Sequence, residues 1–235
     1  MMILGGIQKN SFIDYPGKIS CVIFVSGCNF DCPYCHNPSL VDPFRAEKRV
    51  VIKERAIMDF LHKRRDLLEG VVISGGEPTL SNGLIPFCER IKQMGYPIKL
   101  DTNGSRPQVL DLLIREGLVD YIAMDIKTAP ELYSVFIKRN FEAREILSGI
   151  QLIMASGKDY EFRTTCIRPI VNDRIIEKIA RIIKGAHLYA LQKFVSRDVL
   201  RPEFFRGSVA GYNKKELFRL KSIVEPWVRE CIVRC

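Results

Sequence analysis

The sequence lacks the features that mark membrane-spanning, secreted or repetitive proteins. No apolar run among its 235 residues approaches the roughly 20 residues that a bilayer-spanning helix requires. The first residues show no basic segment followed by a long apolar stretch and a small-residue cleavage site, so no signal peptide is expected. Internal repeats and low-complexity tracts are missing as well. These absences predict a cytoplasmic protein with a single core domain over residues 1–235.

A basic stripe of the kind that binds nucleic acid is also missing. The formal net charge is +9, and Lys and Arg can displace counterions from phosphates. The basic residues are nevertheless spread along the chain, often beside acids, with no interleaved aromatic residues. We therefore expect no nucleic-acid partner and read the charge as favouring solubility and acidic protein partners.

Short β-branched runs alternate with amphipathic segments, which predicts an α/β fold with a mostly parallel sheet. The expected strands are Ile19–Val25, Val71–Ile73, Ile98–Asp101, Tyr121–Lys127, Tyr160–Ile167 and Leu188–Gln192. The expected helices have apolar residues at helical spacing; they are Glu54–Leu68, Leu84–Met94, Pro107–Glu116, Asn172–Lys184 and a C-terminal helical tail within 213–235. Six strand–helix alternations are too few for an eight-stranded barrel and predict a partial (β/α)6 barrel.

Three of the eight cysteines lie close together, directly after the first expected strand. A disulfide framework belongs to small secreted domains, so in a reducing compartment clustered cysteines indicate ligands or redox groups. Cys28, Cys32 and Cys35 fall in a segment where Gly27 and Pro33 oppose regular structure. Three thiolates on one loop can reach three corners of an iron–sulfur cube and leave the fourth iron open for chemistry.

The same residues allow other chemistries. Cys32 and Cys35 form a C-x-x-C of the glutaredoxin kind, although that motif should open a helix and His-Asn-Pro follows at once. Cys32 to His36 also spells the C-x-x-C-H of covalent haem attachment, which belongs outside the cytoplasm. A zinc site would need a fourth ligand, and His36 is poorly placed for it. Spacing alone favours the cluster and leaves zinc and thiol chemistry open.

The pattern C-x3-C-x2-C, with Tyr34 before the third cysteine, resembles the signature of the radical S-adenosylmethionine (SAM) superfamily. The resemblance implies a [4Fe–4S] cluster on Cys28, Cys32 and Cys35, with SAM as the second cofactor. The segment Gly75-Gly76-Glu77-Pro78 is similar to the element that holds the SAM amino group in these enzymes. Two glycines let the backbone approach a ligand closely, at a strand end where parallel sheets bind ligands.

Later strand ends carry further motifs that resemble those of glycyl-radical-enzyme activases. These are Asp101-Thr102-Asn103, Asp125 and Lys127, and Arg163 on the fifth expected strand. The resemblance implies that these side chains lie near the SAM carboxylate, with Arg163 able to pair with it. Gln192 and Phe194 are weaker candidates for the adenosine region, since an aromatic side chain there is ordinarily part of the core.

Within the superfamily, the segment from Gln8 to Gly17 and the Cys-His-Asn sequence resemble the activating protein of anaerobic ribonucleoside-triphosphate reductase. This resemblance implies an enzyme that cleaves SAM reductively and generates a glycyl radical on a partner enzyme. A flavodoxin or ferredoxin would supply the electron, and no residue is expected to act as a catalytic acid or base. The alternatives are a radical SAM enzyme that modifies a small molecule, peptide or RNA, and a zinc-binding or thiol redox protein.

Overall fold

The computed structural model describes residues 2–42, 51–136, 142–206 and 209–235. Its strands follow one another in the sheet in chain order; they are β1 (Leu4–Ser11), β2 (Ser20–Val25), β3 (Gly70–Gly75), β4 (Ile98–Thr102), β5 (Tyr121–Asp125), β6 (Asp159–Cys166), β7 (Leu188–Lys193) and β8 (Glu230–Arg234). All six expected strands are present. The structure adds β1 and β8, which the sequence analysis did not anticipate.

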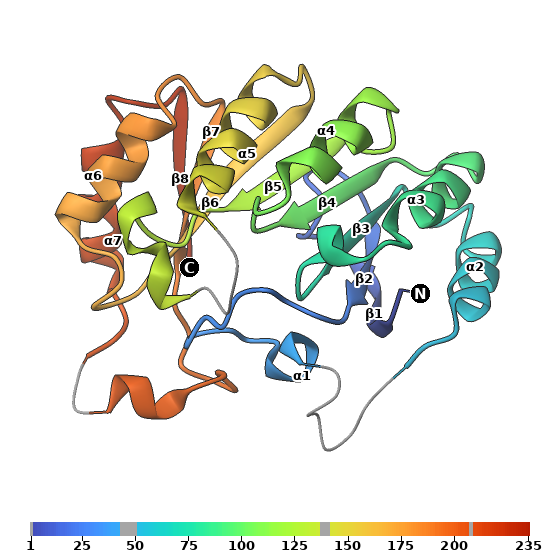
Figure 1. Cartoon of the computed structure of the whole chain (residues 1–235), viewed down its shortest axis with the longest axis horizontal. Coiled ribbons are helices and arrows are strands. Elements are labelled where there is room, and N and C mark those ends of the chain that lie inside the picture. Colours follow the sequence, from blue (N-terminus) through green and yellow to red (C-terminus); the bar gives the residue numbers. More distant parts are fainter. Residues whose placement is uncertain (1, 43–50, 137–141, 207–208) are drawn as a thin grey trace. The chain divides into compact units, whose positions relative to one another are not determined.

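Helices occupy most of the connections between strands (Figure 1). They are α1 (Pro38–Val41), α2 (Glu54–Lys63), α3 (Leu84–Gln93), α4 (Pro107–Arg115), α5 (Ala143–Ala155), α6 (Asp173–Ile182) and α7 (Lys214–Val224), with short 3₁₀ helices η1 (Pro78–Leu80), η2 (Pro130–Val135) and η3 (Pro202–Phe205). Helix α2 ends five residues before the expected Leu68, and α5 was not expected. Among the described residues, no helix combines the length and apolar character needed to traverse a bilayer.

Strand pairing is mostly parallel, which confirms the predicted α/β fold class. β2 pairs with β3 and β3 with β4 in parallel, and so do β6 with β7 and β7 with β8. β1 pairs antiparallel with β2. The central residues of β3, Val71, Val72 and Ile73, are fully buried, as expected for a parallel strand covered on both faces.

The chain divides into two compact units. The first comprises Met1–Phe30, Asn37–Thr102 and Gln108–Ile122, and the second comprises Asp31–His36, Asn103–Pro107 and Ala123–Cys235. The predicted single core domain over residues 1–235 therefore stays a prediction. The predicted helical tail contains α7, but β8 follows it and pairs with β7.

Helix boundaries in the second unit follow from local capping. The Asn172 side chain accepts a hydrogen bond from Ile175 N at 3.0 Å, which begins α6. Asn213 and Glu216 form a reciprocal capping box at the start of α7. The two helices pack against each other, and α7 packs on β7 and β8 (Figure 1). Helix α7 therefore covers one face of β7 and β8.

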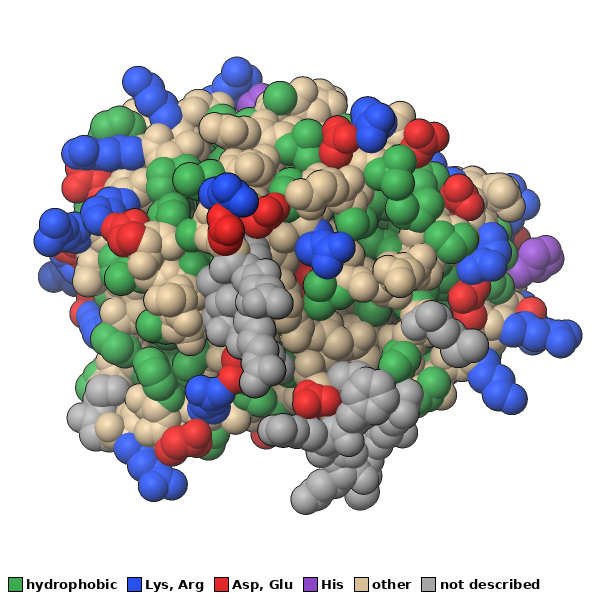
Figure 2. Space-filling view, viewed as in Figure 1, with side chains coloured by type: hydrophobic (Ala, Val, Ile, Leu, Met, Phe, Trp, Pro, Cys, Tyr) green, Lys and Arg blue, Asp and Glu red, His purple; other side chains and the backbone are tan. Residues whose placement is uncertain are grey.

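The charge distribution on the surface agrees with the dispersed charge of the sequence. On the face shown in Figure 2, Lys and Arg side chains are scattered and often lie beside acidic ones.

Candidate cofactor-binding site

The first part of the cysteine loop belongs to the first unit and is held by backbone hydrogen bonds. Gly27 N donates to Leu40 O at 2.7 Å, and Cys28 N donates to Val41 O at 3.2 Å. Phe30 N lies 3.4 Å from the Cys28 sulfur, in the geometry of an N–H donor to sulfur. Helix α1 thus fixes the backbone from which the Cys28 side chain extends.

The second part of the loop, Asp31–His36, belongs to the second unit and turns tightly. Cys35 N donates to Cys32 O at 3.0 Å, so the last two cysteines lie on one turn. Leu200 N donates to Cys35 O and Arg201 N to Pro33 O, both at 3.0 Å. The side chain of Arg201 also pairs with Asp31. The sequence analysis did not predict these contacts, because no local sequence pattern identifies residues 200 and 201 as neighbours of the cysteines.

Tyr34, between those cysteines, has a buried hydroxyl group. Its side chain is 4% exposed and meets Phe136 edge to face at 6.1 Å between ring centroids. Among the described residues the hydroxyl finds no hydrogen-bond partner. Burial, followed by the nearby Cys32 sulfur, raises the pKa of Tyr34 well above its ordinary value. Burying a polar atom without a hydrogen-bond partner costs free energy, so this hydroxyl suits a site where a bound group supplies the missing partner.

The donor chemistry of the loop fits an iron–sulfur cluster. Three thiols fall within the eight residues 28–35, and none of the eight cysteines, all of them among the described residues, is in a disulfide. Within the described ranges, no three or more His, Cys, Asp or Glu side chains surround a single point where one ion could sit. A cubane binds each thiolate at a different iron, so its ligands need not converge on one point.

Gly75, the last residue of β3, and Gly76, which follows it, allow close backbone packing. A Cβ atom on Gly75, whose φ is +129°, would lie 2.2 Å from Val25 O. A Cβ atom on Gly76 would lie 2.1 Å from Gly27 O. Gly76 N donates to Val25 O and Glu77 N to Gly27 O, both at 2.8 Å. The glycines therefore let the end of β3 lie directly against the start of the cysteine loop, a role that the motif alone did not reveal.

Glu77 and Thr102, two predicted site residues, contact each other in the interior of the first unit. The Glu77 side chain, in a residue only 1% exposed, accepts hydrogen bonds at one oxygen from Thr79 N at 3.1 Å, Thr79 Oγ1 at 2.5 Å and Thr102 Oγ1 at 2.8 Å. Pro78, also buried, begins η1 directly after it. This carboxylate joins the ends of β3 and β4.

The remaining motif residues of the third expected strand end have different environments. Asp101 forms an ion pair with Lys99, a buried lysine that sequence reasoning did not single out. Asn103, which belongs to the second unit, accepts a hydrogen bond from Ser105 N at 2.9 Å. Its side chain therefore shapes the turn that follows β4.

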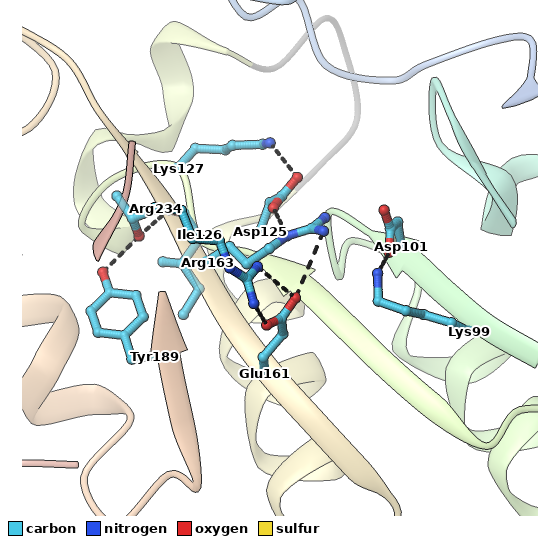
Figure 3. A network of polar contacts seen from close by, with 10 residues as sticks. Lys99, Asp101, Asp125, Ile126, Lys127, Glu161, Arg163, Tyr189 and Arg234 are labelled. Atoms are coloured by element: carbon cyan, nitrogen blue, oxygen red, sulfur yellow. Dashed lines mark hydrogen bonds and ion pairs between the residues drawn. The ribbon is translucent and has the colours of Figure 1, made fainter. Parts of the chain in front are cut away.

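Three predicted site residues of the second unit form one ionic cluster (Figure 3). Arg163 Nε donates to Asp125 Oδ1 at 2.7 Å, and Lys127 Nζ donates to Asp125 Oδ2 at 2.9 Å. Burial alone would raise the pKa of Asp125, but the two cations outweigh it and hold that pKa well below its usual range. Burial alone would lower the pKa of Lys127, and the Asp125 charge raises it instead. The cluster carries one more positive than negative charge, which suits a carboxylate ligand.

Two further charged residues adjoin this cluster and were missed. Glu161 lies two positions before Arg163 on β6, and both its oxygens accept hydrogen bonds from Arg234 on β8, at 3.1 and 2.5 Å. An acidic residue between the large apolar residues Tyr160 and Phe162 was the available signal for Glu161. No local signal connects it to Arg234, which is 73 residues away.

Phe194 and Gln192, the weaker candidates, lie at the end of β7. Phe194 is 5% exposed and packs on His36 and Phe205, with ring centroids 6.0 and 5.5 Å apart. Its position matches the ordinary role of an aromatic core residue, here directly beside the cysteine turn. Gln192 is partly exposed.

Comparison with known proteins identifies similar chains. The model of the family described as the Radical SAM superfamily matches residues 22–183, more than half of the chain. A protein of Methanocaldococcus jannaschii, named as a candidate glycyl-radical enzyme activating enzyme, is 36% identical over 99% of this chain and 95% of its own length. A second protein of that organism, with the same kind of name, is 28% identical over 78% of this chain and 69% of its own.

Solved structures show the same fold. The structure of SuiB from Streptococcus suis bound to the precursor peptide SuiA matches with a TM-score of 0.68 at 13% identity. The match covers 91% of this chain and 48% of the SuiB chain, so the present chain spans about half of SuiB. At this level of identity the likeness concerns the fold alone.

Proposed function

Since the chain belongs to the radical SAM superfamily, we propose that it is the activating enzyme of a glycyl radical enzyme, and specifically of anaerobic ribonucleoside-triphosphate reductase. The observation that carries the first part is the 36% identity, over nearly the whole of both chains, to a protein named as an activating enzyme of this kind. The segment from Gln8 to Gly17 supports the choice of the reductase as partner.

Radical SAM enzymes use a [4Fe–4S] cluster and SAM, and these are the cofactors of this chain. In our proposal Cys28, Cys32 and Cys35 hold the cluster. With one electron from an external donor, the two groups together would supply a 5′-deoxyadenosyl radical and release methionine, and that radical would take a hydrogen atom from a glycine of the partner. The thiol donor set supports this assignment, and so does the Tyr34 hydroxyl, which has no hydrogen-bond partner in the described part of the chain.

The chain itself contributes orientation and charge. The cationic cluster of Arg163 and Lys127 around Asp125 would attract and orient the SAM carboxylate. Gly75, Gly76, Glu77 and Pro78 would define the backbone beside the SAM amino group. Their tight packing makes this backbone rigid, as a positioning element must be.

The remaining motif residues Asp101, Thr102 and Asn103 would line the same cofactor. The ion pair of Asp101 with Lys99 and the hydrogen bonds of the Thr102 and Asn103 side chains help to fix the direction of each side chain. A reduced flavodoxin or ferredoxin as electron donor and a cytoplasmic location stay predictions. No side chain is assigned as a general acid or base.

Electron paramagnetic resonance tests the proposal. After anaerobic reconstitution, the protein is mixed with SAM, a reductant and purified anaerobic ribonucleoside-triphosphate reductase. We expect the doublet of a glycine-centred radical, with no signal when SAM is left out. Cleavage of SAM without this doublet would reject the reductase as partner and favour an enzyme that modifies a small molecule, a peptide or RNA. Reconstituted protein that contains zinc and lacks iron and sulfide would reject radical chemistry altogether.

A further inference from the structure

The ion pair between Glu161 and Arg234 joins two strands that do not pair with each other. β7 pairs with β6 on one side and with β8 on the other, so the side chains of Glu161 and Arg234 meet across β7 (Figure 3). Both oxygens of Glu161 accept from the two terminal nitrogens of Arg234, which is the bidentate geometry of a strong ion pair. The Glu161 side chain is 1% exposed, and that of Arg234 is 38% exposed.

Arg163 lies between two carboxylates. Its Nε is 2.7 Å from Asp125 Oδ1, and its terminal nitrogen NH1 is 4.0 Å from Glu161 Oε1. Figure 3 shows the guanidinium group of Arg163 between these two side chains. Charges therefore alternate in sign from Arg234 through Glu161, Arg163 and Asp125 to Lys127.

The two carboxylates compete for the Arg163 guanidinium. A buried carboxylate is unfavourable unless it is paired and hydrogen-bonded, and Arg234 meets this requirement for Glu161. Without the Arg234 charge, Arg163 would be the remaining cation with a described ion-pair contact to Glu161. Attraction in the interior would then draw the guanidinium toward Glu161 and away from Asp125.

We propose that Arg234 is a positioning residue, which neutralises buried Glu161 and so keeps Arg163 on Asp125, in the orientation that binds the SAM carboxylate. This inference rests on the proposed function, because it takes SAM as the ligand of Arg163. It goes further by giving a role to a pair of residues that the family motifs do not include.

The test measures SAM binding by isothermal titration calorimetry on anaerobically reconstituted protein, together with urea unfolding of the protein without its cluster. Arg234→Gln should weaken SAM binding about tenfold, the lower range for residues that act through a ligand-binding group. Arg234→Lys keeps the charge and loses the bidentate geometry, so its loss should be smaller. The double variant Glu161→Gln with Arg234→Gln removes both charges and should recover most of the affinity.

A matched control is Arg219→Gln. Arg219 is an arginine of the same unit that pairs with Asp173 between α7 and α6, away from the proposed SAM contacts. Its replacement should leave SAM affinity unchanged.

The outcomes separate the inference from the function on which it rests. A wild-type protein that binds its cluster but not SAM would reject the proposed function. Wild-type SAM affinity in Arg234→Gln would overturn the positioning role alone. Equal losses of affinity in Arg234→Gln and the double variant would also overturn it, because they would mean that the pair only anchors β8. If Arg234→Gln does not fold, Arg234→Lys is compared with the double variant instead. Wild-type SAM affinity in Arg234→Lys, or a loss in the double variant at least as large as in Arg234→Lys, would overturn the positioning role.

Discussion

The residues at the end of β3 and the charged residues of the β5–β6 region were both predicted to contact SAM. Different interactions hold the two regions in place. At the end of β3, the backbone at Gly75 and Gly76 lies so close to neighbouring backbone atoms that a Cβ atom would clash. Glu77 accepts hydrogen bonds from hydroxyl groups there. At the end of β5 and within β6, charged side chains pair with one another, with Asp125 between Arg163 and Lys127. Packing controls the first region and charge controls the second. Substitutions in the first should therefore lower stability through steric clash or a lost hydrogen bond, and loss of the Asp125 charge in the second should lower stability by an amount that depends on pH.

The largest effect is expected from Gly76→Ala. The added Cβ would lie 2.1 Å from Gly27 O and 3.1 Å from Leu40 O, and backbone oxygens cannot move aside as a flexible side chain can. We expect a loss of about 3 kcal/mol or more in the free energy of unfolding, measured by urea denaturation. The matched control is Gly6→Ala, whose Cβ would make ordinary contact with Phe24 at 3.4 Å. Equal losses in the two variants would contradict control by packing at the end of β3.

The next largest effect is expected from Asp125→Asn, which leaves the charges of Arg163 and Lys127 without their carboxylate. We expect a loss of about 2 kcal/mol in the free energy of unfolding at neutral pH. Because the native pKa of Asp125 is depressed, its contribution is complete above the unfolded pKa of about 3.9 and declines as pH falls toward the native value. The stability difference between wild type and variant should therefore shrink below about pH 4. A difference that stays constant on acidification would show that charge does not control this region.

A smaller effect is expected from Thr102→Val, which removes one of the hydrogen bonds accepted by buried Glu77. Shape is nearly conserved, so the loss should reflect one hydrogen bond to a charged group, about 1.5 kcal/mol in urea denaturation. Thr128→Val is a useful comparison, because the Thr128 hydroxyl donates to the uncharged Ile170 O at 3.1 Å. A smaller loss at position 102 than at position 128 would argue against a structural role for the Glu77 carboxylate.

The smallest effect is expected from Arg219→Gln. The side chains of Arg219 and Asp173 are 55% and 46% exposed, and solvent screens such pairs strongly. The urea midpoint should stay within the scatter of repeated wild-type measurements. A clear shift would mean that exposed pairs stabilise this chain as much as the buried cluster does.

The sequence predicted the strands whose own residues favour extended structure. It missed β1, whose residues do not. Five of the six expected strands contain β-branched residues, as in Val71 to Ile73, and all six are present. β1 contains Gly5, Gly6 and polar residues, so only its pairing with β2 makes it a strand. Helix α5 contains Gly149, which lowers helix propensity. The structure explains this glycine, because a Cβ there would lie 2.7 Å from Gly104 O.

The candidate site shows the same division. The resemblance to family motifs singled out Asp125, Lys127 and Arg163, and the structure brings them together. The partners that hold the site come from distant segments, as Arg234 does for Glu161 and as Leu200 and Arg201 do for the cysteine turn. Such contacts are set by tertiary structure, and no local pattern in the sequence encodes them.

The most direct test of the account is the formation of 5′-deoxyadenosine by wild type, Cys32→Ala and Cys235→Ala under dithionite. Cys235 is exposed and lies outside the cysteine loop, so its variant controls for the loss of a thiol. We expect product from wild type and Cys235→Ala and none from Cys32→Ala. Product from Cys32→Ala at the wild-type level, or none from wild type that has its iron and sulfide, would contradict it.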